Sequence, residues 1–148
     1  MKHIARILVG AILAFASICL AVWFLGILAV HSPLLLAWWK THPSLVFFAS
    51  EAIAFLPFVA LLGVTLAKLF ATSPVPKATL KAMLSVAVAL AVSYAGTLGD
   101  PQLLISTLRE SSGLVLAFLL GVPAVAFLAG RMWSNNRFER SRVGSSVS

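Results

Sequence analysis

The sequence predicts an all-α membrane protein, a four-helix transmembrane bundle with both termini in the cytoplasm. Hydrophobic residues make up 61% of the 148 residues and charged residues only 10%, whereas soluble domains need about 25% charged residues to keep their surface wet. Nearly all the charges lie between four long apolar runs. Each run is close to or above the length of about 20 residues that a helix needs to cross a bilayer.

The first span is predicted over residues 7–30, directly after the basic residues Lys2 and Arg6. At about 1.5 Å per residue, this uncharged run is long enough to cross the ~30 Å hydrocarbon layer. It is longer than the apolar core of a typical signal peptide, and no clean cleavage site follows it. We therefore expect a retained anchor.

The second span is predicted over residues 45–67 and contains Glu51, the only acidic residue inside any of the four runs. Ionisable residues within spans usually mark a pathway or a partner. Pro57 follows six positions later and removes the hydrogen bond to the Ile53 carbonyl, so we expect a kink near the carboxyl.

The third predicted span, residues 82–98, is the shortest and follows a connection at 71–81, where two prolines would interrupt a helix. Asp100 is predicted to cap a short helix over residues 101–110, with Pro101 at its first position. We expect this short helix to lie in the membrane interface, in the second outer loop.

The fourth span is predicted over residues 112–130. The polar, basic and serine-rich composition of residues 134–148 predicts disorder. The chain would therefore divide into a bundle at residues 1–133 and a disordered basic cytoplasmic tail.

The distribution of basic residues predicts the orientation. One side of the membrane would carry most of them, and the other side only Lys40 and Arg109. The larger group consists of Lys2, Arg6, Lys68, Lys77, Lys81, Arg131, Arg137, Arg140 and Arg142. The positive-inside rule then predicts a multi-pass protein of a bacterial inner (plasma) membrane with both termini inside. Because these residues flank apolar runs, we expect the lipid bilayer as a partner and no nucleic acid.

Small side chains recur along one face of each span, and such faces let helices approach closely in lipid. The residues expected at these contacts are Gly10, Ala14, Gly63, Ala67, Gly96, Gly113 and Gly121. In the second span, Glu51 lies about 140° from the small-residue face. If that face packs inward, Glu51 points out of the bundle.

An outward Glu51 would share its sector with Phe47, Phe55 and Phe58. A charged carboxyl facing lipid costs several kcal/mol. We therefore expect this face to be covered by another copy of the chain, by another membrane subunit or by an outer loop. Lys40 and Arg109 are the candidate outer-side partners of Glu51.

Two functions follow from these observations. The first is a non-enzymatic subunit or accessory protein of a membrane assembly, held through the face of Glu51, Phe47, Phe55 and Phe58. The alternative is a small oligomeric transporter or channel with Glu51 as its proton or cation site, and Pro57 exposing a carbonyl beside it. Four short spans with one embedded glutamate loosely resemble the small multidrug-resistance exporters. Their glutamate lies in the first span, so no residue role is transferred.

Enzymatic activity is not expected. The sequence has no G-x-S-x-G, H-E-x-x-H or phosphate-loop motif, and no paired acids within the spans. No metal site is expected, because His31 and His42 flank one loop without a third ligand nearby. No cofactor is expected either, since no span contains a histidine for haem.

Overall fold

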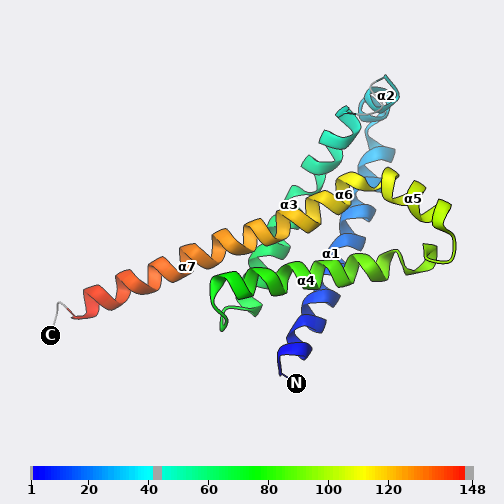
Figure 1. The fold of residues 1–148 in the computed structure, drawn as a ribbon. Helices are drawn as coiled ribbons and strands as arrows, with labels where there is room; N and C mark the ends of the chain where they lie inside the picture. The colour runs from blue at the N-terminus through cyan, green and yellow to red at the C-terminus, as the bar shows by residue number, and fades with distance from the viewer. Residues whose placement is uncertain (1, 42–44, 146–148) are drawn as a thin grey trace.

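A computed structural model describes residues 2–41 and 45–145, and all regular structure within these ranges is helical (Figure 1). The elements in chain order are α1 (Lys2–His31), α2 (Pro33–Thr41), α3 (Leu45–Leu69), α4 (Val75–Ser93), the 3-10 helix η1 (Ala95–Thr97), α5 (Pro101–Glu110), α6 (Ser112–Leu116), the π-helix η2 (Ala117–Gly121) and α7 (Val122–Ser145).

Four stretches of the described chain are long and apolar enough to cross a membrane, as the sequence predicts. They are Ile4–Leu28, Glu51–Leu69, Val75–Ser93 and Ser112–Asn136. The last of these is built from α6, η2 and α7, which follow one another without a break. The fold is therefore compatible with a multi-pass membrane protein.

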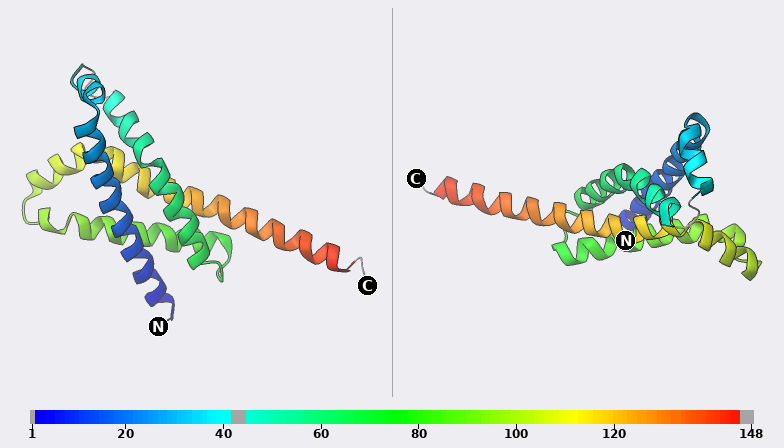
Figure 2. Two further views of the ribbon diagram at one scale, coloured as in Figure 1. Left: turned by 180° about the vertical axis from the view of Figure 1, so that it is seen from behind. Right: turned by 90° about the horizontal axis from the view of Figure 1, so that it is seen from above.

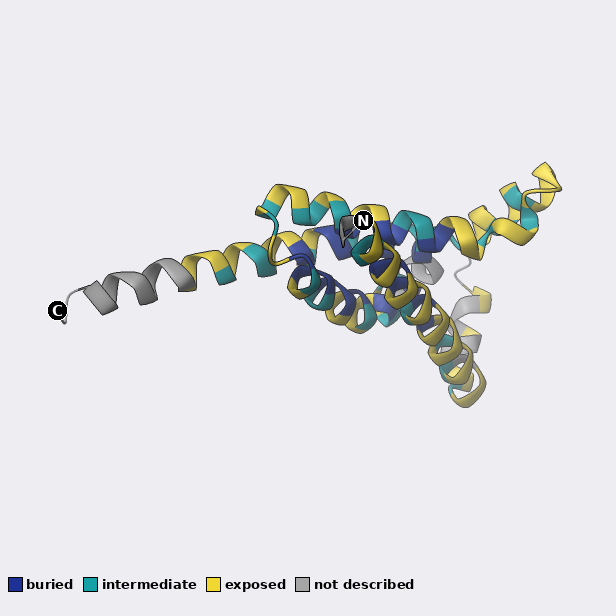
Figure 3. Ribbon diagram, turned by 90° about the horizontal axis from the view of Figure 1, so that it is seen from below, coloured by how far each residue is buried: buried dark blue, intermediate teal, exposed yellow. Residues whose placement is uncertain are grey.

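The long helices form a ring in which each packs against two main neighbours. α1 packs against α3 and α4, and α7 packs against the same two helices. Figure 2 shows that α4 crosses α1 steeply. The buried apolar side chains come from all four helices and face the centre of the ring. Figure 3 shows the complementary pattern, because the outward sides of the long helices are mostly exposed. Those outward sides carry many large apolar residues, as lipid-facing surfaces do.

The third span differs from its predicted bounds, because α4 begins at Val75 and ends at Ser93. The prolines that were expected to delay the helix lie at its start, with Pro74 as the N-cap and Pro76 in the first turn. A proline in the first turn sacrifices no intrahelical hydrogen bond, since the first four N–H groups have no partner within the helix.

This shift also changes the role of Gly96, which was expected at a helix contact. Gly96 falls in η1, beyond the end of α4, and is exposed. A Cβ atom built on it would meet no atom within 4 Å. Gly96 is therefore not a packing residue of the bundle.

Residues 101–110 form the predicted short helix, α5, and Asp100 is its N-cap. The Asp100 Oδ1 accepts hydrogen bonds from the backbone N–H groups of Gln102 (3.0 Å) and Leu103 (3.3 Å). These bonds satisfy two of the donors that a helix start leaves without partners.

The C-terminal segment differs from the expected disorder, because α7 continues to Ser145. No proline follows Pro123, and arginine and glutamate are good helix formers. Extending an existing helix fixes only one residue for each new hydrogen bond, so it costs less conformational entropy than starting a new helix. Residues 146–148 of the predicted tail lie outside the described residues.

Candidate functional site

Glu51 lies inside the chain's own bundle, contrary to the outward orientation expected for it. Its side chain is only 7% exposed, and Phe55, one turn later on the same face of α3, is 1% exposed. Val59, Leu62 and Leu66 continue this buried face along the helix. The residues on it follow the spacing of three and four that places side chains on one side of a helix.

The aromatic sector beside Glu51 is accordingly divided. Phe55 lies in the core against Phe118 of η2, with ring centroids 6.1 Å apart. Phe58 is half-buried, and its ring centroid lies 5.6 Å from that of Phe24 on α1. The side chain of Phe47 lies outside the described part of the chain. The expected outward face of Glu51, Phe55 and Phe58 is therefore largely an internal surface.

The physical reason lies in how the helices match each other. α3 has neighbours on two sides, α1 and α7, and it turns the face of Glu51, Phe55 and Val59 toward them, whereas Leu56 and Ala60 on its small-residue face are exposed. Large side chains of α3 fit against glycines of the facing helix, as ridges of one helix fit into grooves of another.

Gly113 of α6 leaves the space that the Glu51 carboxyl occupies. A Cβ atom built on Gly113 would lie 2.7 Å from Oε2 of Glu51 and 3.4 Å from its Cβ. Gly113 and Glu51 are both buried. Any other residue at position 113 must therefore displace the carboxyl.

Two further glycines continue this contact toward the other end of α3. A Cβ built on Gly121 of η2 would lie 2.7 Å from Cγ1 of Val59, and one on Gly63 of α3 would lie 2.6 Å from Cβ of Val125. We call this row of close contacts the glycine seam. It consists of Glu51 against Gly113, Phe55 against Phe118, Val59 against Gly121, and Gly63 against Val125.

The remaining predicted packing residues also lie at helix contacts. A Cβ built on Gly10 of α1 would lie 2.6 Å from Oγ of Ser85 on α4, and Ala14 is fully buried. Ser85 Oγ donates to the Lys81 carbonyl (2.9 Å) and lies 3.3 Å from the Ile7 carbonyl across the α1–α4 contact. Ala67, near the end of α3, is buried as well.

The candidate polar partners of Glu51 do not reach it. Lys40 lies in the last turn of α2 and Arg109 in the last turn of α5, and both side chains are exposed. Among the described residues, no ion pair joins either side chain to the Glu51 carboxyl, and no hydrogen bond of that carboxyl is found.

Pro57 is exposed, and so is Ile53, whose carbonyl its ring leaves without a donor. Six residues correspond to about 600° of helical rotation. Pro57 therefore lies on a different face of α3 from Glu51. The expected grouping of a carboxyl with a freed carbonyl is not assembled.

One polar feature near this end of the molecule was not predicted. The hydroxyl of Tyr94, at the end of α4, hydrogen-bonds to Ser111 Oγ, which also donates to the carbonyl of Thr107. Ser111 is both the C-cap of α5 and the N-cap of α6, and it lies two residues before Gly113. Tyr94 therefore ties α4 to the turn that positions Gly113. Nothing in the sequence pattern marks this pairing, since Tyr94 belongs to the third predicted span and Ser111 lies at the junction between the predicted short helix and the fourth span.

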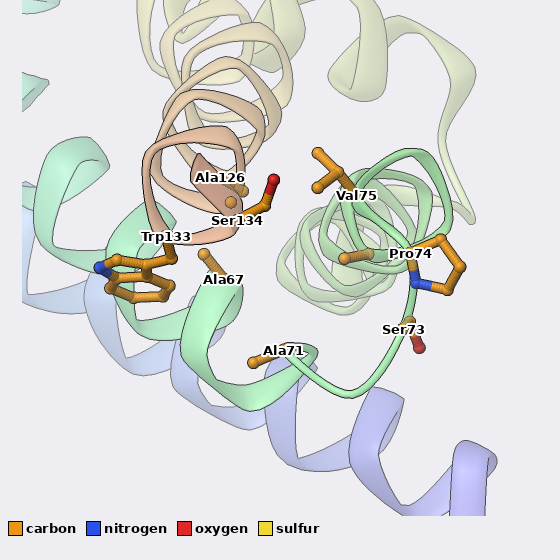
Figure 4. Close-up of a pocket in the computed structure, with 10 residues that line it drawn as sticks. Ala67, Ala71, Ser73, Pro74, Val75, Ala126, Trp133 and Ser134 are labelled. Carbon is orange, nitrogen blue, oxygen red and sulfur yellow. The ribbon is translucent and has the colours of Figure 1, made fainter. Parts of the chain in front are cut away.

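A pocket lies near the other end of the glycine seam, between α3, α4 and α7 (Figure 4). Its volume is about 350 Å³. We call it the α3–α4–α7 pocket, and it is lined by Ala67, Ala71, Ser73, Pro74, Val75, Ala78, Ala126, Gly130, Trp133 and Ser134. The glycine seam separates it from Glu51.

The candidate site is therefore one buried carboxyl at one end of a closely packed helix pair, with an apolar pocket at the other end.

No protein-family model matches the sequence, and no curated protein or solved structure matches it either.

Proposed function

We propose that this protein is a multi-pass protein of a bacterial inner (plasma) membrane that acts as a non-enzymatic subunit or accessory protein of a membrane assembly. The observation that carries the proposal is the closed glycine seam. It favours a rigid helical unit over a unit that conducts ions or solutes through itself.

A transporter or channel needs a polar route between its ion site and the opposite side of the membrane. From Glu51 to the pocket residue Ala67, the chain covers about 24 Å of helix at ~1.5 Å per residue. Along this length the seam is filled by Phe55 against Phe118 and by Val59 against Gly121. Apart from Glu51, the only buried polar side chain among those described is Ser85, on the α1–α4 contact.

The proposed orientation places both termini in the cytoplasm. Arg6 donates to Thr72 Oγ1 (2.6 Å) and Lys81 donates to Ser73 Oγ (2.7 Å), which gathers basic groups of α1 and α4 at the α3–α4 connection. A cluster of basic groups at one end of a bundle favours the cytoplasmic side for that end.

The proposed position of α5 is the outer membrane interface. Leu103, Ile105 and Leu108 are exposed apolar residues of this helix, which also carries Gln102 and Arg109. A short helix that carries both apolar and polar side chains is suited to lie along the boundary between lipid and water.

The assembly role is tested by photo-crosslinking in cells. A photo-reactive amino acid is introduced at one exposed position on each long helix, at Trp23, Leu61, Leu84 or Leu128. We expect one helix face to give a crosslinked product of a single discrete mass, identified as a companion protein by mass spectrometry. Four positions that crosslink no protein would overturn the proposal.

The second candidate function is a proton or cation site at Glu51 in an oligomer. It is favoured by one observation, the 7% exposure of Glu51, for whose carboxyl no ion pair or hydrogen bond with another described residue is found. Such groups inside membrane proteins often serve as relays.

Proton flux into proteoliposomes tests this candidate. A potassium diffusion potential drives the flux, and a trapped pH-sensitive dye reports it. If Glu51 carries protons, Glu51→Gln abolishes the flux while the purified protein elutes unchanged. Flux that is equal in the wild type, in Glu51→Gln and in empty vesicles would reject the candidate.

A further inference from the structure

The α3–α4–α7 pocket is lined only by uncharged residues. Its ten lining residues are alanines, serines, a proline, a valine, a glycine and a tryptophan, most of them labelled in Figure 4. Its volume of about 350 Å³ lies within the range of about 300–1,000 Å³ typical of small-molecule sites. A charged group that entered it would lose its hydration without gaining a charged partner from the lining residues. The wall therefore suits an uncharged ligand.

The wall of the pocket changes from apolar to polar along its length. On α3 and the connection after it, the lining begins at Ala67 and ends at Ser73, and on α7 it begins at Ala126 and ends at Ser134. α3 and α7 run in the same direction, since Glu51 lies against Gly113 and the later residues of the glycine seam follow in order. The two serines therefore lie at the same end of the pocket, and the other end is apolar.

The serine end can hydrogen-bond an uncharged head. Ser73 Oγ accepts a hydrogen bond from Lys81 at 2.7 Å. A hydroxyl group that accepts a bond still has its own hydrogen to donate. Ser134 supplies a second, exposed hydroxyl. An ester carbonyl or an alcohol of a ligand would find hydrogen-bonding groups at this end.

The apolar part of the pocket has the length of most of one acyl chain. From Ala126 to Ser134 the wall of α7 rises about 12 Å, at ~1.5 Å per residue. One acyl chain crosses about half of the ~30 Å hydrocarbon layer, which is ~15 Å. The pocket lies between three helices that are long and apolar enough to cross a membrane, so lipids are the molecules that would reach it there.

We propose that the α3–α4–α7 pocket binds the acyl chain of an uncharged acylglycerol, whose ester carbonyl accepts a hydrogen bond from the Ser73 hydroxyl. The apolar end admits the chain, and the uncharged lining disfavours the charged head of a phospholipid. The proposal rests on the multi-pass placement proposed above, because only a chain in a membrane would meet such a ligand at high concentration.

Quenching of tryptophan fluorescence tests the site, because Trp133 lines the pocket whereas Trp23 of α1 is 67% exposed. Two variants each keep one of the four tryptophans, either Trp133 or Trp23, and have phenylalanine at the other three positions. Each variant is reconstituted in phosphatidylcholine vesicles that contain a minor mole fraction of one lipid with bromine on its acyl chains. The brominated lipid is a monoacylglycerol, a phosphatidylcholine or a phosphatidylglycerol.

The expected result is selective quenching of Trp133. Per brominated chain, monoacylglycerol should quench Trp133 about fivefold more effectively than phosphatidylcholine, the preference that one net hydrogen bond supplies. The two lipids should quench Trp23 equally, because this residue would contact bulk lipid.

Filling the pocket locates the effect in the variant that keeps only Trp133. Gly130→Leu and Ala71→Leu each place a large side chain on the pocket wall, and each should remove the preference for monoacylglycerol. Gly26→Leu is the control, because a Cβ at this position meets nothing within 4 Å, and it should keep the preference. A thermal unfolding curve in detergent confirms that each variant is folded.

Removing the proposed donor tests the head of the ligand. Ser73→Ala should reduce the preference for monoacylglycerol by about fivefold. Ser93→Ala, at the other end of α4, removes a hydroxyl outside the pocket and should leave the preference unchanged.

Equal quenching of Trp133 by monoacylglycerol and phosphatidylcholine would overturn the site. Stronger quenching by phosphatidylglycerol than by monoacylglycerol would overturn the uncharged head. A preference that persists in folded Gly130→Leu and Ala71→Leu variants would overturn the pocket as its location. A chain that does not enter vesicles contradicts the multi-pass placement, whereas a chain that enters them without selective quenching contradicts the acylglycerol site alone.

Discussion

At the scale of single residues, the main finding is the inward position of Glu51. The sequence reveals that a carboxyl and a row of alanines lie on different faces of the second span, but it does not reveal which face is covered. That depends on the neighbours of α3, and here the glycines of α6 and η2 admit Glu51 and Val59. The identity of the unusual residue was predictable, and its surroundings were not.

The glycine seam leads to a comparative prediction on stability. In Gly63→Ala the new methyl group would meet Val125 Cβ at 2.6 Å and the Val122 carbonyl oxygen at 3.1 Å. A β-branched side chain and a backbone atom cannot move aside easily, so we expect a loss of about 1–3 kcal/mol in the free energy of unfolding. In Gly113→Ala the nearest atom is Oε2, the flexible end of Glu51, so we expect a smaller loss.

Unfolding in mixed micelles with increasing denaturing detergent measures both losses. Gly26→Ala is the control, because a Cβ there meets nothing within 4 Å, and it should unfold like the wild type. A Gly63→Ala variant as stable as this control would contradict the close contact between α3 and α7.

At the scale of elements, the sequence predicts a helix well where a long apolar run or an N-cap residue marks it. It predicts helix ends poorly where they depend on the neighbouring helix. The four spans and α5 follow from runs of apolar residues and from Asp100. The start of α4 does not, because Pro74 and Pro76 can interrupt a helix or begin one. The extension of α7 to Ser145 depends on the helix that precedes it, which composition alone does not represent.

The Asp100 cap supplies a prediction at this scale. Replacing Asp100 with alanine removes the acceptor for the N–H groups of Gln102 and Leu103, which should cost α5 about 1 kcal/mol. Hydrogen exchange should therefore quicken by about fivefold at the amides of 101–110. Asp100→Asn keeps a side-chain acceptor and serves as the control. Unchanged exchange in Asp100→Ala would mean that contacts other than the cap hold the first turn.

At the scale of the whole molecule, the order of helices around the ring organises the ends of the bundle. α3 and α7 are neighbours although α4 lies between them in the sequence. Their contact lies between Glu51 and the α3–α4–α7 pocket. Such an order depends on which helix surfaces fit each other, so hydropathy and charge do not predict it. The distribution of basic residues supports the proposal that the end with Arg6 and Lys81 faces the cytoplasm.

Labelling of single cysteines tests that orientation. In a Cys19→Ser background, Lys40→Cys and Arg109→Cys place thiols at exposed positions at the ends of α2 and α5, and Lys77→Cys places one at an exposed position in the first turn of α4. The basic residues near α4 favour the cytoplasm, since each stabilises its side by about 1 kcal/mol beside an anionic leaflet. A membrane-impermeant maleimide added to intact cells should therefore label positions 40 and 109 and should reach position 77 only after lysis. Labelling of position 77 alone in intact cells would show that the orientation is opposite to the one proposed.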